Sequence, residues 1–174
     1  MANKTMQPRL PDASIYKKYK NQVRQSSKYN VTREKAERTY KGIVFDSVME
    51  MKYFRDVVEP QYESGFIKYY ERQKPYVLLN NFRRDGKFVY GITYVADFYI
   101  EYANDKTEVV DVKGCPDDVA KIKRKLFWQI YPEIDYRWVT YNKAHGGWVD
   151  YDELQKVKRE EKKEKKRKAA IDEG

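Results

Sequence analysis

The sequence predicts an α/β protein of the α+β kind, built from a helix, three strands, a second helix and a last strand in that order. Residues 88–101 and 108–113 are rich in β-branched and aromatic side chains and flank a polar break at residues 104–106, which is typical of strands joined by a turn. Residues 48–59 and 117–131 instead repeat apolar side chains at helical spacing. A chain of 174 residues is long enough for one such domain with a core and flanking tails.

The first helix is predicted over residues 48–59, with Asp46 or Ser47 as its N-cap and Pro60 directly after its last residue. Glu50 follows Ser47 by three residues, which is the spacing of a capping box. Glu50 also shares a helical face with apolar residues that look directed to the core. Two roles therefore stay open for Glu50: a structural cap, or a third carboxylate that faces the sheet.

The strands follow this helix. Residues 64–80 predict a broken strand, and Pro75 indicates that it lies at an edge or a bend. Residues 88–101 predict one long strand, in which Gly91 marks a bulge or a weak point. Its alternate residues are apolar and should face the core: Phe88, Tyr90, Ile92, Tyr94, Ala96, Phe98 and Ile100.

The second helix is predicted over residues 117–131, and Pro132 ends it before a last strand at residues 135–141. Its apolar stripe is predicted to be Val119, Ile122, Leu126 and Ile130. Another face of the same helix gathers basic side chains: Lys121, Arg124 and Lys125. This face is either an ordinary solvated surface or a contact for a phosphate backbone, and the sequence leaves both interpretations open.

Charged residues in the two central strands are the candidate functional site. Asp111 and Lys113 are two residues apart and share one face of their strand, and Asp97 lies on the preceding strand. Two adjacent strands can bring these side chains together on one side of a sheet. Two close carboxylates repel each other unless a proton or a cation lies between them, and Mg²⁺ is a cation that prefers carboxylates and waters. The alternative is an exposed strand edge with an ordinary charge pair and an aspartate that caps a turn.

The two ends of the chain carry the positive charge. Residues 1–42 hold 11 Lys/Arg and 3 Asp/Glu, whereas the centre is slightly acidic and the whole chain has a net charge of +9. Basic arms around a domain indicate a polyanionic partner, most simply nucleic acid, although basic tails can also serve solubility alone. We divide the chain into a basic N-terminal arm, a core domain and a charged C-terminal helix or tail, at residues 1–37, 38–151 and 152–174.

The N-terminal arm mixes aromatic and basic side chains over residues 14–24, where a short helix is predicted. Lys17, Lys18 and Lys20 lie beside two tyrosines, a mixture suited to contacts with phosphates and bases. An arm that becomes ordered only in a complex is the equally weighted alternative.

Other sequence features exclude several protein classes. Cys115 is the one cysteine, so an intrachain disulfide is impossible and a reducing compartment is the default. We find neither an apolar run of about 18–20 residues nor the apolar core of a signal peptide, so we expect a cytoplasmic protein without a membrane partner. We interpret His145, in a glycine-rich loop, as structural rather than catalytic.

The order of these elements and acids resembles the PD-(D/E)XK nuclease superfamily, with its α-β-β-β-α-β core. The resemblance covers roughly residues 38–142, and residues 94–114 are its most specific part. Within the superfamily the chain is similar to small phage-type endonucleases related to Holliday junction resolvases. Two positions depart from the usual motif: Ala96 stands where a proline precedes the first acid, and Asp111 stands where glutamate is more common. The implied fold is a restriction-endonuclease-like core with a central mixed sheet flanked by helices.

The resemblance also implies roles for individual residues. Asp97 and Asp111 would hold Mg²⁺ or Mn²⁺ together with the main-chain carbonyl of Val112. Glu50 would bind the ion directly or through water. Lys113 would orient or deprotonate the attacking water. A further residue, Gln73, matches a glutamine that some relatives place near the site.

Two functions follow as hypotheses. The first is a metal-dependent DNA endonuclease that cuts branched or structured DNA, with Holliday junction resolution in phage recombination or DNA processing as its leading form. Such a resolvase makes two symmetry-related cuts, which predicts a homodimer. The second is a non-catalytic basic DNA-binding or packaging accessory protein, whose acids are structural.

Overall fold

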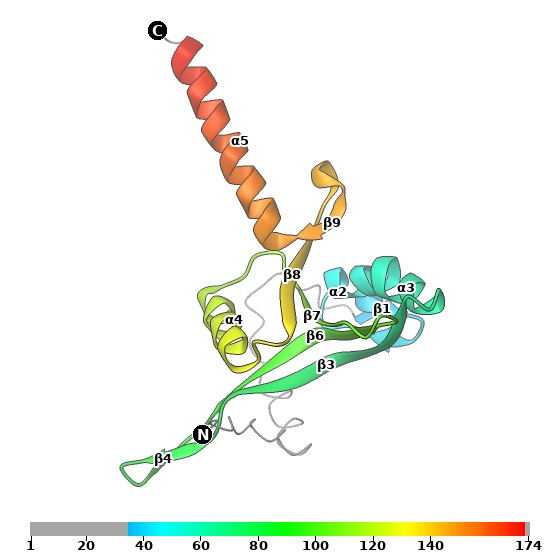
Figure 1. The fold of residues 1–174 in the computed structure, drawn as a ribbon, viewed down its shortest axis with the longest axis vertical. Helices are drawn as coiled ribbons and strands as arrows, with labels where there is room; N and C mark the ends of the chain where they lie inside the picture. The colour runs from blue at the N-terminus through cyan, green and yellow to red at the C-terminus, as the bar shows by residue number, and fades with distance from the viewer. Residues whose placement is uncertain (1–34, 173–174) are drawn as a thin grey trace.

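A computed structural model describes residues 35–172 of the chain, and its centre is a five-stranded mixed sheet flanked by helices (Figure 1). The α+β fold class expected from the sequence is thereby confirmed. The helix predicted over residues 14–24, together with Lys17, Lys18 and Lys20, lies outside the described residues.

The sheet has the strand order β3-β6-β7-β8-β9. The first three of these strands pair antiparallel, β7 and β8 pair parallel, and β8 and β9 pair antiparallel. Helix α4 makes the crossover that the parallel pair requires. The strands are β3 (Ile67–Leu79), β6 (Ile92–Tyr102), β7 (Thr107–Val112), β8 (Asp135–Asn142) and β9 (Gly147–Asp150).

Strand β3 is an edge strand, as Pro75 indicated, but it runs through that proline without interruption, so the predicted break in this strand is wrong. An edge strand tolerates proline because one side of its backbone needs no donor. The sequence did not predict β9, which follows Gly146 and Gly147, two residues with left-handed backbone angles. Paired glycines are typical of a loop, so no local pattern predicted a strand here. The segment becomes the edge strand of the sheet because it pairs with β8.

The first helix is longer than predicted. Helix α2 (Val48–Tyr53) continues through a π-helical turn, η2 (Phe54–Val58), into α3 (Glu59–Glu63). The predicted stop before Pro60 is therefore wrong. Pro60 lies in the first turn of α3, where its missing N–H and fixed φ are tolerated. Ser47 is the N-cap, because its side chain accepts a hydrogen bond from the Glu50 N–H.

The two faces of the sheet pack against different helices. On β7, Val110 and Val112 lie in a hydrophobic cluster with α2 and η2, whereas Val109 lies in a second cluster with Phe127 of α4. Alternate strand residues point to opposite faces, so α2–α3 cover one face and α4 covers the other. Asp97 and Asp111 lie on the sheet between these two helical layers.

Strand β6 changes layers along its length. Phe98 and Ile100 belong to the cluster around α2, but Tyr94 and Ala96, which have the same alternation, belong to the cluster around α4. The change falls at Asp97. The two ends of β6 therefore pack against different helical layers.

Helix α4 (Asp118–Ile130) buries only part of its predicted apolar stripe. Val119 and Ile122 are 61% and 57% exposed, while Phe127 is fully buried. Leu126 and Ile130 pack against the core as predicted. Ala120 and Phe127 pack against the second cluster and Arg124 lies over the Trp138 ring of β8, so the buried face of the helix is rotated from the predicted one and Val119 and Ile122 face outward.

The strand predicted over residues 88–101 is divided at Gly91. A side-chain carbon at Gly91 would lie 2.0 Å from the carbonyl oxygen of Leu79, so only glycine fits where the two chains cross. Phe88 and Tyr90, predicted to face the core, belong instead to an exposed hairpin. That hairpin is β4 (Phe82–Arg84) with β5 (Lys87–Val89).

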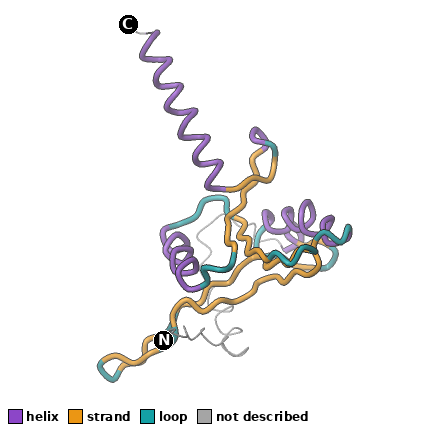
Figure 2. The backbone as a smooth tube through the Cα atoms, in the orientation of Figure 1, coloured by secondary structure: helices purple, strands orange, loops and turns teal. Residues whose placement is uncertain are grey.

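Smaller elements and a long helix complete the chain. Helix α5 (Tyr151–Asp172) projects away from the sheet, and the β4–β5 hairpin lies at the other end of the molecule (Figure 2). None of the helices in residues 35–172 is long and apolar enough to cross a membrane. His145 contacts Asn142 and Glu161, a structural environment. The remaining elements are η1 (Lys35–Arg38), β1 (Thr39–Tyr40), β2 (Ile43–Val44) and η3 (Lys143–His145).

Candidate metal centre

Strands β6 and β7 separate at the two aspartates. Their last ladder pair is Phe98 with Val110, so Asp97 and Asp111 are the next residues facing each other across the fork. The ladder stops there, and the side chain of Asp97 takes the place of the main chain: its Oδ2 accepts a hydrogen bond from the Val112 N–H at 2.8 Å. Strand β7 continues alone beside β8. The sequence expectation that two strands gather these acids is met by this geometry.

Asp111 is almost fully buried, and its two oxygens differ. Oδ2 lies 2.8 Å from Nζ of Lys113 and accepts a hydrogen bond from the Tyr136 hydroxyl at 3.2 Å. Oδ1 is buried and has no hydrogen-bond partner among the described residues. A buried carboxylate oxygen without a donor is costly, and such atoms mark positions where an ion or a water belongs.

The charges of this cluster do not balance. Glu50, Asp97 and Asp111 are all buried, and Lys113 is the cation among them. Burial would lower the pKa of Lys113, but the charges of Asp111, Asp97 and Glu50 outweigh burial and hold that pKa above its ordinary value. With the ammonium charged and the three carboxylates ionised, these four side chains carry a net charge of −2, which protons, a nearby cation or a divalent ion would have to offset.

The pKa values of the other acids show how strongly they repel one another. The pKa of Asp97 is raised well above its ordinary value, first by burial and then by the charges of Asp111 and Glu50. Burial and the neighbouring Asp46 raise the pKa of Glu50 to about 7, against the opposing effects of Ser47 and Lys113. In the absence of a metal ion, protons thus compensate part of the buried charge.

Glu50 combines the two roles that the sequence left open. Its Oε2 accepts a hydrogen bond from the Asp46 N–H at 3.3 Å, close to the helix start, while the Ser47 side chain caps the Glu50 N–H at 3.1 Å. Its carboxylate also lies within electrostatic range of Asp111 and Lys113. The helix start and the acidic cluster are therefore held together by one side chain.

The donor set is suitable for a hard divalent ion. Carboxylate oxygens and a carbonyl are the ligands that Mg²⁺ and Mn²⁺ prefer. In a strand the N–H and C=O of one residue point to the same side, so the carbonyl of Val112 faces the fork as its N–H does. As they stand, no three His, Cys, Asp or Glu side chains within residues 35–172 are gathered closely enough to hold a metal ion.

A family model matches residues 26–146, which include every one of these site residues. The chain belongs to the family described as "Protein of unknown function (DUF1064)". Among curated proteins, no match to the chain was found. The matched segment therefore contains the candidate site, and its chemistry has to be argued from the geometry.

Gln73 lies on the edge strand directly opposite Asp97, between the pairs Arg72 with Phe98 and Lys74 with Ala96. Its φ is +57°, a left-handed conformation that is costly for a residue with a side chain. Its Nε2 is 3.5 Å from Oδ1 of Asp97. Backbone outliers of this kind gather at functional sites, and this one lies opposite the residue at which β6 changes layers.

Arg72 is a site residue that the sequence reasoning missed. Its guanidinium lies 3.9 Å from the centre of the Phe45 ring and donates to the carbonyl of Val44 at 3.3 Å. Burial lowers the pKa of Arg72, and the charges of Glu50, Asp46 and Asp97 oppose that shift. This places a second cation beside the acids. The available signal was its position next to Gln73 on the strand that pairs with the Asp97 strand.

The basic residues predicted on α4 have unequal surroundings. Lys121 forms an ion pair with Asp118 at 2.9 Å, and Lys125 is exposed. Arg124 is 14% exposed, pairs with Asp152 at 2.7 Å and lies 3.7 Å from the Trp138 ring centre. Arg124 therefore joins α4 to the start of α5, and DNA contact on this helix remains a prediction for Lys121 and Lys125.

Proposed function

We propose that this protein is a Mg²⁺- or Mn²⁺-dependent DNA endonuclease of the PD-(D/E)XK type, which hydrolyses phosphodiester bonds. One observation carries the proposal. Asp97 and Asp111 face each other at a fork between two strands, and the buried Oδ1 of Asp111 lacks a partner among the described residues. A purely structural ion pair of Asp111 with Lys113 would explain neither the free oxygen nor the two further buried acids.

The residues of the fork have distinct roles in this proposal. Asp97, Asp111, the carbonyl of Val112 and Glu50 would hold the ion. When bound, such an ion lowers the pKa of a water and stabilises charge that develops on the phosphate.

The remaining side chains act on the water and the phosphate. Lys113, whose ammonium contacts Asp111 at 2.8 Å, positions the attacking water and offsets the charge of the acids. Arg72, beside Asp97 and Glu50, supplies a positive charge for a phosphate oxygen. Gln73 keeps the Asp97 carboxylate in one orientation through its Nε2.

Branched or structured DNA is the proposed substrate, with Holliday junction resolution in phage recombination or DNA processing as the leading form. The net charge of +9, concentrated outside the slightly acidic centre, supports a polyanionic partner. Two cuts on a symmetric junction require two sites, so the proposal includes a homodimer. A cytoplasmic location fits a chain with a single cysteine.

Cleavage of supercoiled plasmid and of a synthetic four-way junction tests the proposal. Cutting is expected with Mg²⁺ or Mn²⁺ and not with EDTA. Asp111→Ala should abolish cutting and keep DNA binding, whereas Asp135→Ala, at an exposed aspartate on the neighbouring strand β8, should cut like the wild type.

Cleavage that survives both EDTA and Asp111→Ala would reject this site. A wild-type protein that binds DNA but cuts none of these substrates with any divalent ion would instead leave the second function, a non-catalytic DNA-binding or packaging accessory protein.

A further inference from the structure

The β4–β5 hairpin is a separate, rigidly specified unit at one end of the molecule. Its two strands pair only with each other among the described strands, and they extend beyond the β3–β6 pair (Figures 1 and 2). Asp85 and Gly86 form the turn with φ of +50° and +75°, the double left-handed geometry that Asp-Gly favours in tight hairpins. At its base, Gly91 donates a hydrogen bond to the Asn81 side chain at 2.7 Å.

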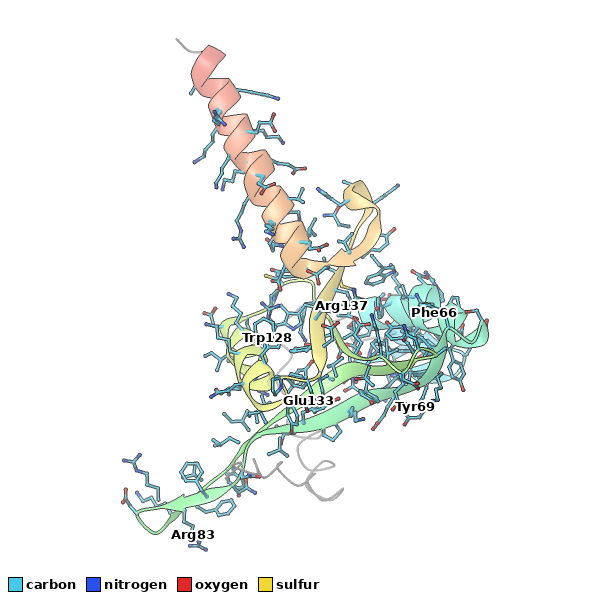
Figure 3. The ribbon with its side chains drawn as sticks, viewed as in Figure 1. Phe66, Tyr69, Arg83, Trp128, Glu133 and Arg137 are labelled. Carbon is cyan, nitrogen blue, oxygen red and sulfur yellow. The ribbon has the colours of Figure 1, made fainter. Side chains whose placement is uncertain are left out.

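The surface of this hairpin is basic and aromatic. Arg84 and Lys87 face each other across the two strands, an arrangement of like charges that weakens an isolated hairpin. Arg83, labelled in Figure 3, is exposed, and its Nη1 donates a hydrogen bond to the carbonyl of Gly86 in the turn at 3.3 Å. Three exposed rings accompany these cations: Phe82, Phe88 and Tyr90, at 42%, 50% and 74% exposure.

Neither the facing cations nor the exposed rings belong to the hydrophobic clusters of the core. The rings of Phe88 and Tyr90 contact each other with centroids 4.9 Å apart and remain outside both hydrophobic clusters. The acid within the hairpin, Asp85, is 3.6 Å from Arg84 and leaves the three cations of the hairpin with a positive excess. A polyanion would relieve the repulsion between Arg84 and Lys87 and cover the rings.

We propose that this hairpin contacts a duplex arm of DNA, entering its major groove with Arg83, Arg84 and Lys87 against phosphates. A two-stranded ribbon has the width that the major groove admits, and apolar side chains there contact thymine methyl groups. Lys87 precedes Asp97 by ten residues, so at strand spacing the contact lies no more than about 33 Å from the acidic cluster. The inference rests on the proposed function for its partner, since the same DNA would be held at the hairpin and cut at the fork.

Equilibrium binding of the full chain to a fluorescent duplex and a four-way junction, in EDTA over a range of salt, tests the hairpin. The variant Arg83→Gln/Arg84→Gln/Lys87→Gln removes three charges from it. The matched control Lys68→Gln/Lys106→Gln/Lys143→Gln removes three exposed charges elsewhere, one at the start of β3 and two on connections between strands. We expect the hairpin variant to bind at least about tenfold more weakly at 150 mM salt, and its salt slope to fall by about 2–3. The control should bind like the wild type.

A second variant, Phe88→Ser/Tyr90→Ser, keeps all charges and should weaken binding without changing the salt slope. Thermal melting of each variant should match the wild type, because these side chains lie outside the core. If the hairpin variants bind as tightly as the control with an unchanged slope, the inference is wrong, whether or not the wild type cuts DNA. If they bind weakly while the wild type never cuts, the inference stands and the nuclease proposal fails.

Discussion

Asp97 accepts a hydrogen bond from the main-chain N–H of Val112 at 2.8 Å, although the register of β6 and β7 places Asp97 opposite Asp111. A side chain thus replaces the next ladder bond between two strands. This replacement of a main-chain bond by a side-chain bond opens the sheet at one point, and Asp111 Oδ1 has no donor there among the described residues. The predictions below follow from the charge gathered at this opening.

Divalent ions should stabilise the wild-type protein through Asp111. The free energy of unfolding should rise in Mg²⁺ or Mn²⁺ as RT ln(1 + [L]/Kd), or about 2.7 kcal/mol at 100 times Kd. Asp111→Asn removes one of the proposed ligands and should abolish this increase. Thermal melting with EDTA and with each ion measures it, and a variant that responds to the ions like the wild type would exclude Asp111 as a ligand.

The stability of the metal-free protein should fall as pH rises through the range set by Glu50. Its pKa is raised from 4.5 to about 7 in the folded protein, so between these values the folded state binds more protons than the unfolded state. Stability is therefore lost as pH increases, by about 3 kcal/mol at most.

Urea unfolding in EDTA between pH 4.5 and pH 7.5 measures this loss. Glu50→Gln, which keeps a side chain able to accept from the Asp46 N–H, should reduce the slope to the part contributed by Asp97, and Glu133→Gln at an exposed position should leave it unchanged. Equal slopes for all three proteins would contradict the buried, charged environment assigned to Glu50.

Removing the ammonium of Lys113 should have opposite effects on folding and on ion binding. Lys113→Gln leaves three buried acids without their cation, so the metal-free protein should lose about 1–3 kcal/mol, less than for a fully buried pair because Lys113 is 28% exposed. The same change removes a competitor for the acids, so Mn²⁺ should bind at least as tightly as to the wild type, while cleavage is lost. Calorimetric titration measures the binding, and weaker Mn²⁺ binding would show that Lys113 does not compete with the ion for the carboxylates.

Two variants of Gln73 separate backbone strain from side-chain function. Gln73→Gly and Gln73→Ala both remove the contact to Asp97, but only glycine adopts a φ of +57° without penalty. The glycine variant should be more stable than the alanine variant by about 1–2 kcal/mol in chemical denaturation. Equal stabilities would mean that the strand is not strained at this residue.

Local patterns predicted much of the fold and of the site. Strand alternation placed Asp111 with Lys113, and the turn at residues 104–106 placed the Asp97 strand beside them. The N-cap at Ser47 and the edge position of Pro75 also followed from backbone chemistry. All of these depend on residues close together in the chain.

The errors depend on contacts between distant segments. The division at Gly91 arises because its chain crosses the carbonyl of Leu79, which no local pattern reports. Val119 and Ile122 are as apolar as the residues that α4 does bury, so only the way the helix is rotated on the sheet decides which of them are covered. Arg72 gains its importance from Glu50 and Asp97, which lie on two other elements.

The most direct test of the central claim is a crystal structure with Mn²⁺, in which anomalous scattering locates the ion. We predict one peak at the fork, roughly 2.0–2.6 Å from oxygens of both Asp97 and Asp111, with Nζ of Lys113 displaced from Asp111. A fully occupied Mn²⁺ elsewhere with none at the fork, or a fork whose two carboxylates share no ion at saturating Mn²⁺, would contradict the account.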